Sequence, residues 1–257
     1  MSTERDNPNN STRGSLRLAP SVEELEDHKR KLPRQFVNFT FYRVRPEWRL
    51  LDESEKSDCK EGFVRAIDEF RRALLIHTYS TVGLRTNADF MIWRIGYDLE
   101  PMQQMSTSLN RTPMAKYVEV TQSFLSMTKR SMYIEKGCPD HKEDRVHVVP
   151  GEANYLFVCP LLRTREWYSR PQEQRQEMMD EHLRVGSKYR SVKLHTSYSF
   201  GLDDQEFVVA LETDSPSDFL DLVQELRETK ASCFTLRDTP MFTCRQRTLG
   251  DCLDALG

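Results

Sequence analysis

The sequence predicts an α+β fold made of two successive halves, each with the element order β-α-β-β-α-β. In each half, strand-like alternation of apolar and polar residues is interrupted by two segments with apolar residues at helical spacing. A local signature also recurs, because Tyr79-Ser-Thr-Val-Gly-Leu precedes Asp89-Phe-Met-Ile and Tyr198-Ser-Phe-Gly-Leu precedes Glu206-Phe-Val-Val. In this order both helices cover one face of an antiparallel sheet. We therefore expect two ferredoxin-like repeats whose free sheet faces meet, forming a dimeric α+β barrel within one chain.

The first half begins with a strand near 35–42, where Val37, Phe39 and Phe41 alternate with residues that include two polar side chains. A helix over 52–73 follows, because Phe63, Ile67 and Phe70 recur at helical spacing among charged residues. The remaining elements expected in this half are strands at 75–82 and 89–95, a helix at 100–109 and a strand at 117–130.

The second half repeats the order of the first. The elements expected here are a strand at 154–159, a helix at 165–185, strands at 192–199 and 206–212, a helix at 217–227 and a strand at 240–245.

Composition divides the chain into four segments. Residues 1–34 are polar and predict a mobile arm with one short helix, 35–134 form the first repeat, 135–152 a hydrophilic linker, and 153–257 the second repeat. The linker contains Cys138-Pro-Asp-His141, whose spacing could supply half of a metal site. No second half with matching spacing follows, so we interpret this segment as linker.

The composition also limits the class of protein. Of 257 residues, 38% are hydrophobic and 30% charged, and the net charge of −3 attracts neither nucleic acid nor an anionic membrane. No apolar run reaches the roughly 20 residues that span a bilayer, and the first residues lack a signal-peptide pattern. Six scattered cysteines without a CxxC pair indicate reduced thiols. We expect a cytoplasmic protein with no nucleic-acid or membrane partner.

Three motifs in the second half carry a family resemblance. Glu166-Trp-Tyr, Met179-Asp-Glu-His and Gly201-Leu-Asp-Asp-Gln-Glu-Phe follow one another within the duplicated fold. In this combination the chain resembles the chlorite dismutase and coproheme decarboxylase superfamily from about residue 35 to 247. The resemblance implies an iron porphyrin cofactor, haem b or coproheme, with His182 as the ligand to iron, a role that suits the lone pair of a neutral imidazole nitrogen.

At three positions the chain departs from the pattern that the resemblance implies. Cys159, before Pro160, stands where decarboxylating members carry a radical-forming tyrosine, and it is either a core residue or a redox-active neighbour of the haem. Leu194 stands at the distal position, where relatives carry arginine or glutamine. A slip of one residue would instead turn His195 toward the pocket as a distal base. Glu228 is the possible substitute for the carboxylate that orients the proximal histidine, because Lys230 occupies the expected position.

The resemblance further assigns Trp167 to the porphyrin edge and Arg163 or Lys188 to the propionates, each equally explicable as packing or surface charge. It implies a haem-dependent oxidoreductase, with peroxide-dependent coproheme decarboxylase-like activity in haem biosynthesis as the specific hypothesis. Chlorite dismutation is a second hypothesis. A haem-binding or scaffold protein that has lost the catalytic set is the alternative of a different class. The resemblance also implies a ring-shaped homo-oligomer, commonly a homopentamer.

Overall fold

The computed structural model describes residues 33–133 and 147–257, and residues 34–257 form one compact unit. Nearly all of the predicted N-terminal arm and most of the predicted linker, including Cys138 and His141, lie outside the described residues. The chain is α+β with a large antiparallel sheet, as the sequence predicted. None of the described helices is both long and apolar enough to cross a membrane.

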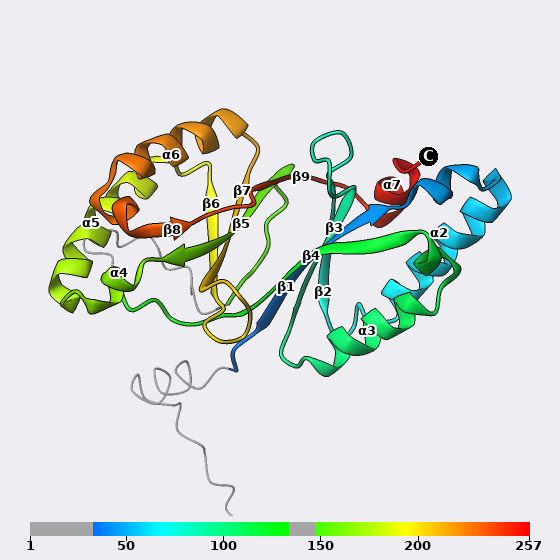
Figure 1. Cartoon of the computed structure of the whole chain (residues 1–257), viewed down its shortest axis with the longest axis horizontal. Helices are drawn as coiled ribbons and strands as arrows, with labels where there is room; N and C mark the ends of the chain where they lie inside the picture. The colour runs from blue at the N-terminus through cyan, green and yellow to red at the C-terminus, as the bar shows by residue number, and fades with distance from the viewer. Residues whose placement is uncertain (1–32, 134–146) are drawn as a thin grey trace, which may run out of the picture. The chain divides into compact units, whose positions relative to one another are not determined.

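The elements of the first half come in the predicted order (Figure 1). They are β1 (Phe36–Val44), η1 (Pro46–Leu50), α2 (Glu53–Asp68), β2 (Leu75–Ser80), β3 (Phe90–Gly96), α3 (Glu100–Asn110), η2 (Pro113–Lys116) and β4 (Val118–Met127). Asp52 fixes the start of α2 with a capping box, because its side chain accepts from the Glu55 N–H while the Glu55 side chain accepts from the Asp52 N–H.

The second half contains two helices where the sequence predicted one. Its elements are β5 (Tyr155–Arg163), α4 (Arg165–Ser169), α5 (Gln172–Lys188), β6 (Lys193–Tyr198), β7 (Phe207–Thr213), α6 (Pro216–Glu228), η3 (Lys230–Phe234), β8 (Thr235–Arg237), β9 (Phe242–Gln246) and α7 (Leu249–Asp254). The single helix predicted over 165–185 is wrong, since Arg170 and Pro171 separate α4 from α5. Proline disfavours helical backbone in the residue before it and cannot donate an N–H inside a helix.

The strands form one closed sheet. Their hydrogen-bonded order is β7-β6-β4-β1-β3-β2-β9-β5-β8, and β5 also pairs with β7, so the first eight strands of this order close on themselves. All the pairings between these strands are antiparallel. The two seams between the halves are short, with Met127 opposite Tyr198 at one and Tyr79 and Ser80 opposite Gln246 and Arg245 at the other.

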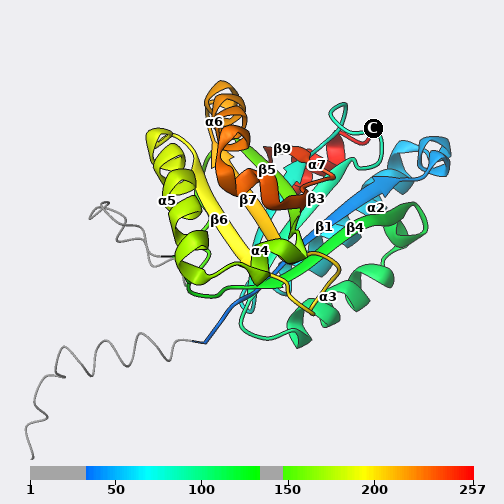
Figure 2. The ribbon, with the colours of Figure 1, turned by 60° about the vertical axis from the view of Figure 1, so that its left-hand side comes forward.

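The helices lie outside this sheet (Figures 1 and 2). One apolar core separates the first half of the sheet from α2, α3 and α7, and a smaller one lies between the second half and α5 and α6. A third core fills the inside of the closed sheet and draws residues from both halves. Along β1, Val37, Phe39 and Phe41 point inside, whereas Asn38 and Thr40 bind Arg94 on the helix side, as the period of two requires.

Candidate functional site

Helix α5 lies over the second half of the sheet and carries His182. It packs against α6 and η3, yet none of its 17 residues is buried. A helix that covers a sheet ordinarily buries an apolar stripe, but Met178, Met179 and Leu183 of α5 remain half-buried. The side chains in the middle of α5 are therefore only partly covered by the rest of the protein.

His182 is half-buried, and its Nδ1 atom is buried with no hydrogen-bond partner among the described residues. Burial and the positive charge of Arg163 lower the pKa of this imidazole to about 4, against a smaller opposing effect of Glu181. The ring is therefore neutral at pH 7. A neutral imidazole keeps a nitrogen lone pair that can bind a metal ion.

Arg163 and Trp167 lie together near His182. Arg163 ends β5, and its Nη1 donates to the carbonyl of Ala231 in η3 and to Thr235 Oγ1 at 3.3 Å. Its guanidinium lies 4.9 Å from the centre of the Trp167 ring. Thr164 caps α4 by accepting from the Trp167 backbone N–H, and the buried ring of Trp167 lies 5.5 Å from that of Phe234 in η3. The structure thus brings together three of the residues that the sequence assigned to the site.

A hydrogen-bonded pair beside them was not predicted. Glu206 is buried, and its Oε2 accepts from the Tyr168 hydroxyl at 2.6 Å and from the Arg163 backbone N–H at 2.8 Å. Burial and this hydrogen bond raise the pKa of Tyr168 above its usual value. The motif Glu166-Trp-Tyr contained Tyr168, but nothing in the sequence linked it to a residue 38 positions later.

Leu194 and His195 are neighbours in strand β6, so their side chains point to opposite faces of the sheet. Leu194 pairs with Leu211, which packs in the core below α6, so Leu194 is on the helix face, where it is 47% exposed. His195 pairs with Ala210 of the interior core, and its Nε2 lies 2.7 Å from Glu212 Oε2. The structure does not bring His195 to His182, and its catalytic role stays a prediction.

Cys159 lies on the helix face of β5, opposite Val209. It is buried, and burial, reinforced by Asp238, raises the pKa of its thiol to about 12, so the thiol stays protonated at neutral pH. This environment is that of an unreactive core cysteine. Its assignment to the site by sequence stays a prediction.

Comparison with known proteins places this geometry in a family. A family model described as chlorite dismutase matches residues 56–247. The chain belongs to the chlorite dismutase family. It is 28% identical over 210 residues to a coproheme decarboxylase from Mycolicibacterium smegmatis, a match that covers 81% of this chain and 88% of the relative. Identity to a chlorite dismutase from Ideonella dechloratans is 25% over 209 residues, with 80% and 73% covered.

Solved structures of the chlorite dismutase family share the fold. A chlorite dismutase from Candidatus Nitrospira defluvii in complex with imidazole superposes with a TM-score of 0.78 at 22% identity, covering 89% of this chain and 98% of that one. The fold predicted from the sequence is therefore confirmed as that of chlorite dismutase. The division into two repeats stays a prediction.

Two other residues that the sequence assigned to the site of this family member have surface positions. The ammonium of Lys188 pairs with Glu225 of α6. Glu228 is exposed at the end of α6 and makes no hydrogen bond to His182. The carboxylate nearest in sequence to His182 is Glu181, whose Oε2 accepts from the Lys230 backbone N–H at 3.0 Å and so ties α5 to η3.

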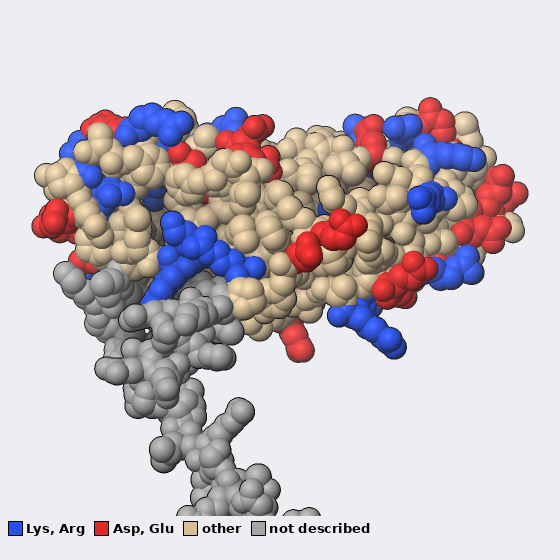
Figure 3. Space-filling model, turned by 90° about the horizontal axis from the view of Figure 1, so that it is seen from below, with Lys and Arg blue, Asp and Glu red and all other residues tan. Residues whose placement is uncertain are grey.

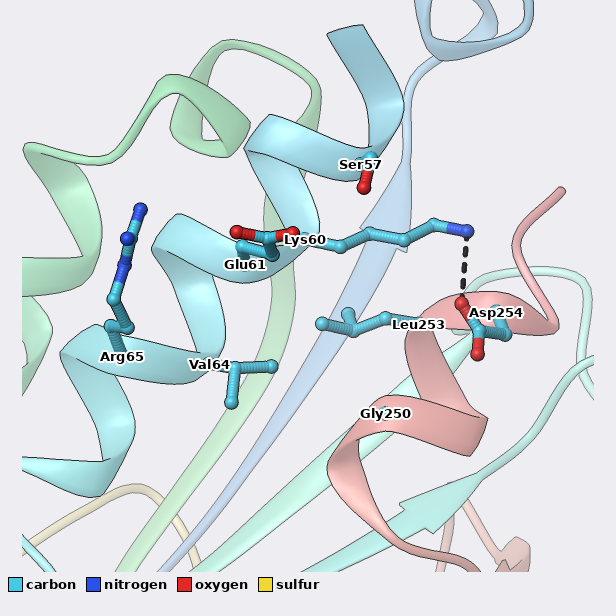
Figure 4. Close-up of a pocket in the computed structure, with 8 residues that line it drawn as sticks. All are labelled: Ser57, Lys60, Glu61, Val64, Arg65, Gly250, Leu253 and Asp254. Carbon is cyan, nitrogen blue, oxygen red and sulfur yellow. Dashed lines mark hydrogen bonds and ion pairs between the residues drawn. The ribbon is translucent and has the colours of Figure 1, made fainter. Parts of the chain in front are cut away.

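The hollow shown in Figure 4 lies in the helix layer that covers the first half of the sheet. It lies between α2 and α7, where Lys60 pairs with Asp254 at 3.2 Å, and its lining includes none of the predicted site residues. Viewed from below, charged side chains of both signs are spread over the surface (Figure 3). No group of three or more His, Cys, Asp or Glu among residues 33–133 and 147–257 could hold a metal ion.

Proposed function

We propose that the protein binds an iron porphyrin between α5 and the second half of the sheet, with His182 as the iron ligand, and acts as a peroxide-dependent, coproheme decarboxylase-like oxidoreductase. The observation that carries the proposal is a half-buried, neutral imidazole whose buried Nδ1 has no partner among the described residues, on a helix that buries none of its residues. The relative in Mycolicibacterium smegmatis, a coproheme decarboxylase, supports the specific activity.

The residues present fit such a group. An unpaired buried nitrogen is costly unless a partner is added on binding, and a flat apolar ring would cover the half-buried side chains of α5. Exposed apolar side chains nearby are Leu194 on β6 and Phe200 in the segment that follows β6. His182 would hold the iron, and Trp167 would lie near the porphyrin edge. Bound iron porphyrin supplies the redox chemistry with peroxide that amino-acid side chains lack.

Arg163 would act through its charge. Its guanidinium is held by Ala231 and Thr235 and faces the ring of Trp167, so it has a fixed position near His182. There it would attract porphyrin carboxylates and, together with the larger effect of burial, keep His182 unprotonated, and both effects favour the bound state. Lys188 would have to leave Glu225 before it could bind a propionate.

One alternative is favoured by the distal side. Leu194 presents no charge or hydrogen bond there, and the thiol of Cys159 is buried and protonated. Leu194 cannot act as a distal base, and the protonated thiol of Cys159 does not replace an oxidisable phenol. These observations support a porphyrin-binding or scaffold protein without catalysis as the second candidate, and they give no support to chlorite dismutation, which the resemblance links to a distal arginine.

Absorption spectroscopy with haem b and coproheme tests the proposal. The native chain and His147→Ala, a histidine control outside the site, should bind one porphyrin per chain with a Soret band. In His182→Ala the band should be shifted or lost, and added imidazole should restore it. If neither porphyrin binds the native chain, the proposal is wrong.

Peroxide added to the coproheme complex then separates the two candidates. Mass spectrometry of the extracted porphyrin detects whether propionate carboxyl groups have been lost as carbon dioxide. Such a loss indicates the decarboxylase-like activity. An unchanged porphyrin mass, with binding retained, indicates the non-catalytic alternative.

A further inference from the structure

The interior of the closed sheet contains three buried polar atoms without a protein partner. They are the Tyr79 hydroxyl on β2, Trp93 Nε1 on β3 and Glu212 Oε1 on β7, and none of the described residues hydrogen-bonds to them. Tyr79 and Trp93 are 0% exposed and Glu212 is 2% exposed. Buried polar groups in folded proteins almost always have a hydrogen-bond partner, so three unpaired atoms in one core need an explanation.

The three side chains belong to one group around His195. Glu212 Oε2 accepts from the Gly151 backbone N–H at 2.7 Å and lies 2.7 Å from His195 Nε2. The ring of His195 stands edge-on to Trp93, with centroids 5.5 Å apart. Tyr79 is a diagonal neighbour of Trp93 on the same inner face, since Tyr79 pairs with Met91 in the β2–β3 register.

The charge of Glu212 acts on Tyr79. Burial is the main reason that the pKa of the Tyr79 phenol is raised, and the negative charge of Glu212 adds to it. Burial opposes the charge of Glu212 itself, but the hydrogen bonds from His195 and Gly151, with the charge of Lys193, outweigh it and lower the pKa of this carboxyl. Glu212 is therefore charged at neutral pH, and its second oxygen requires a hydrogen-bond donor.

The chemistry of these atoms selects the kind of ligand. Trp93 Nε1 can only donate, a charged Glu212 Oε1 can only accept, and the Tyr79 hydroxyl can do both. A cation would be repelled by the positively polarised indole N–H, and an anion would be repelled by Glu212. The ligand must therefore be neutral, donate at least once and accept at least once. It must also be small, because Phe39 stacks on Trp93 and fills the adjacent space.

We infer that this interior site binds a single water molecule, which donates to Glu212 Oε1 and accepts from Trp93 Nε1 and the Tyr79 hydroxyl. Three hydrogen bonds are the usual number for a buried water. The water links strands of both halves, since Tyr79 and Trp93 belong to the first half and Glu212 to the second. It thereby adds to the two short seams between the halves. This site is independent of porphyrin binding.

The sign of one stability change tests the inference. Tyr79→Phe removes only the hydroxyl. If the hydroxyl binds water, its loss should lower the melting temperature by roughly 2–4 °C, the shift that corresponds to one hydrogen bond in a protein of this size. If the hydroxyl is simply unpaired, its removal should leave the melting temperature unchanged or raise it, and the inference is overturned.

A control and a direct observation complete the test. Tyr42→Phe removes a hydroxyl from the other core and should change the melting temperature by less than Tyr79→Phe. A crystal structure that resolves buried waters should show a density peak within roughly 2.6–3.2 Å of at least two of the three atoms. Absence of that peak while other buried waters are visible would also overturn the inference.

Discussion

The lowered pKa of His182 predicts that the porphyrin-free protein becomes less stable as the pH falls. In an unfolded chain a histidine takes up its proton near pH 6.5, whereas burial and Arg163 hold the pKa of His182 in the folded protein at about 4. Between these values the unfolded state binds more protons than the folded state. The contribution of His182 to the free energy of unfolding is therefore fully present above pH 6.5 and is lost as the pH falls toward 4.

The size of the loss follows from the two pKa values. Their difference corresponds to at most about 3 kcal/mol, and about 2.5 kcal/mol is already lost near pH 4.5. Urea unfolding of the porphyrin-free native chain and of His182→Gln, near pH 7.5 and near pH 4.5, measures it. The free energy of unfolding of the native chain should fall by about 2.5 kcal/mol more than that of the variant between these conditions.

The comparison with His182→Gln isolates one residue. Burial also lowers the pKa of His77, but His77 is present in both proteins and its contribution cancels. A difference between native and variant that does not change with pH would refute the reasoning, because it would mean that His182 titrates alike in the folded and unfolded states.

Three further predictions concern residues outside the imidazole. Asn38→Leu should lower the free energy of unfolding in urea by about 3 kcal/mol, because Asn38 Oδ1 accepts from Nε and Nη2 of the buried Arg94, which has no carboxylate partner among the described residues. Asp52→Ala should cost about 1 kcal/mol in the same assay through loss of the α2 capping box. A thiol reagent should modify the exposed Cys233 quickly and the buried Cys159 only on unfolding, as measured by mass spectrometry. Equal rates of modification would contradict the burial of Cys159.

Much of the fold was predictable because local patterns reflect which face of each element is buried. The alternation in β1 predicted a strand, and Val37, Phe39 and Phe41 do point into the interior core. The boundaries were less accurate where a single residue decides, as at Pro171, which divides the predicted helix into α4 and α5. The short β8 and α7 were not predicted, since three and six residues carry too little periodicity.

The candidate site was predictable only in part. His182 came from the family resemblance; the charge of Arg163 acts on His182, and Arg163 lies over the ring of Trp167. The missing hydrogen bond of His182 Nδ1 and the pair formed by Tyr168 and Glu206 depend on contacts between segments that are distant in sequence. No periodicity within one element contains that information.

The chemistry on the distal side depends on the register of one strand. Neighbouring residues of a strand point to opposite faces, so a slip of one position would exchange Leu194 and His195. The pairing of Leu194 with Leu211 fixes the register and keeps His195 inside the sheet, where its Nε2 lies 2.7 Å from Glu212 Oε2. Moving His195 to the helix face would leave the charged Glu212 buried without this partner. The free-energy cost of that buried charge is not compensated by contacts with apolar neighbours. The interior pair therefore stabilises the register that puts Leu194 on the helix face, where we propose that the porphyrin binds. A catalytic role of His195 on that face would require a register of β6 shifted by one residue.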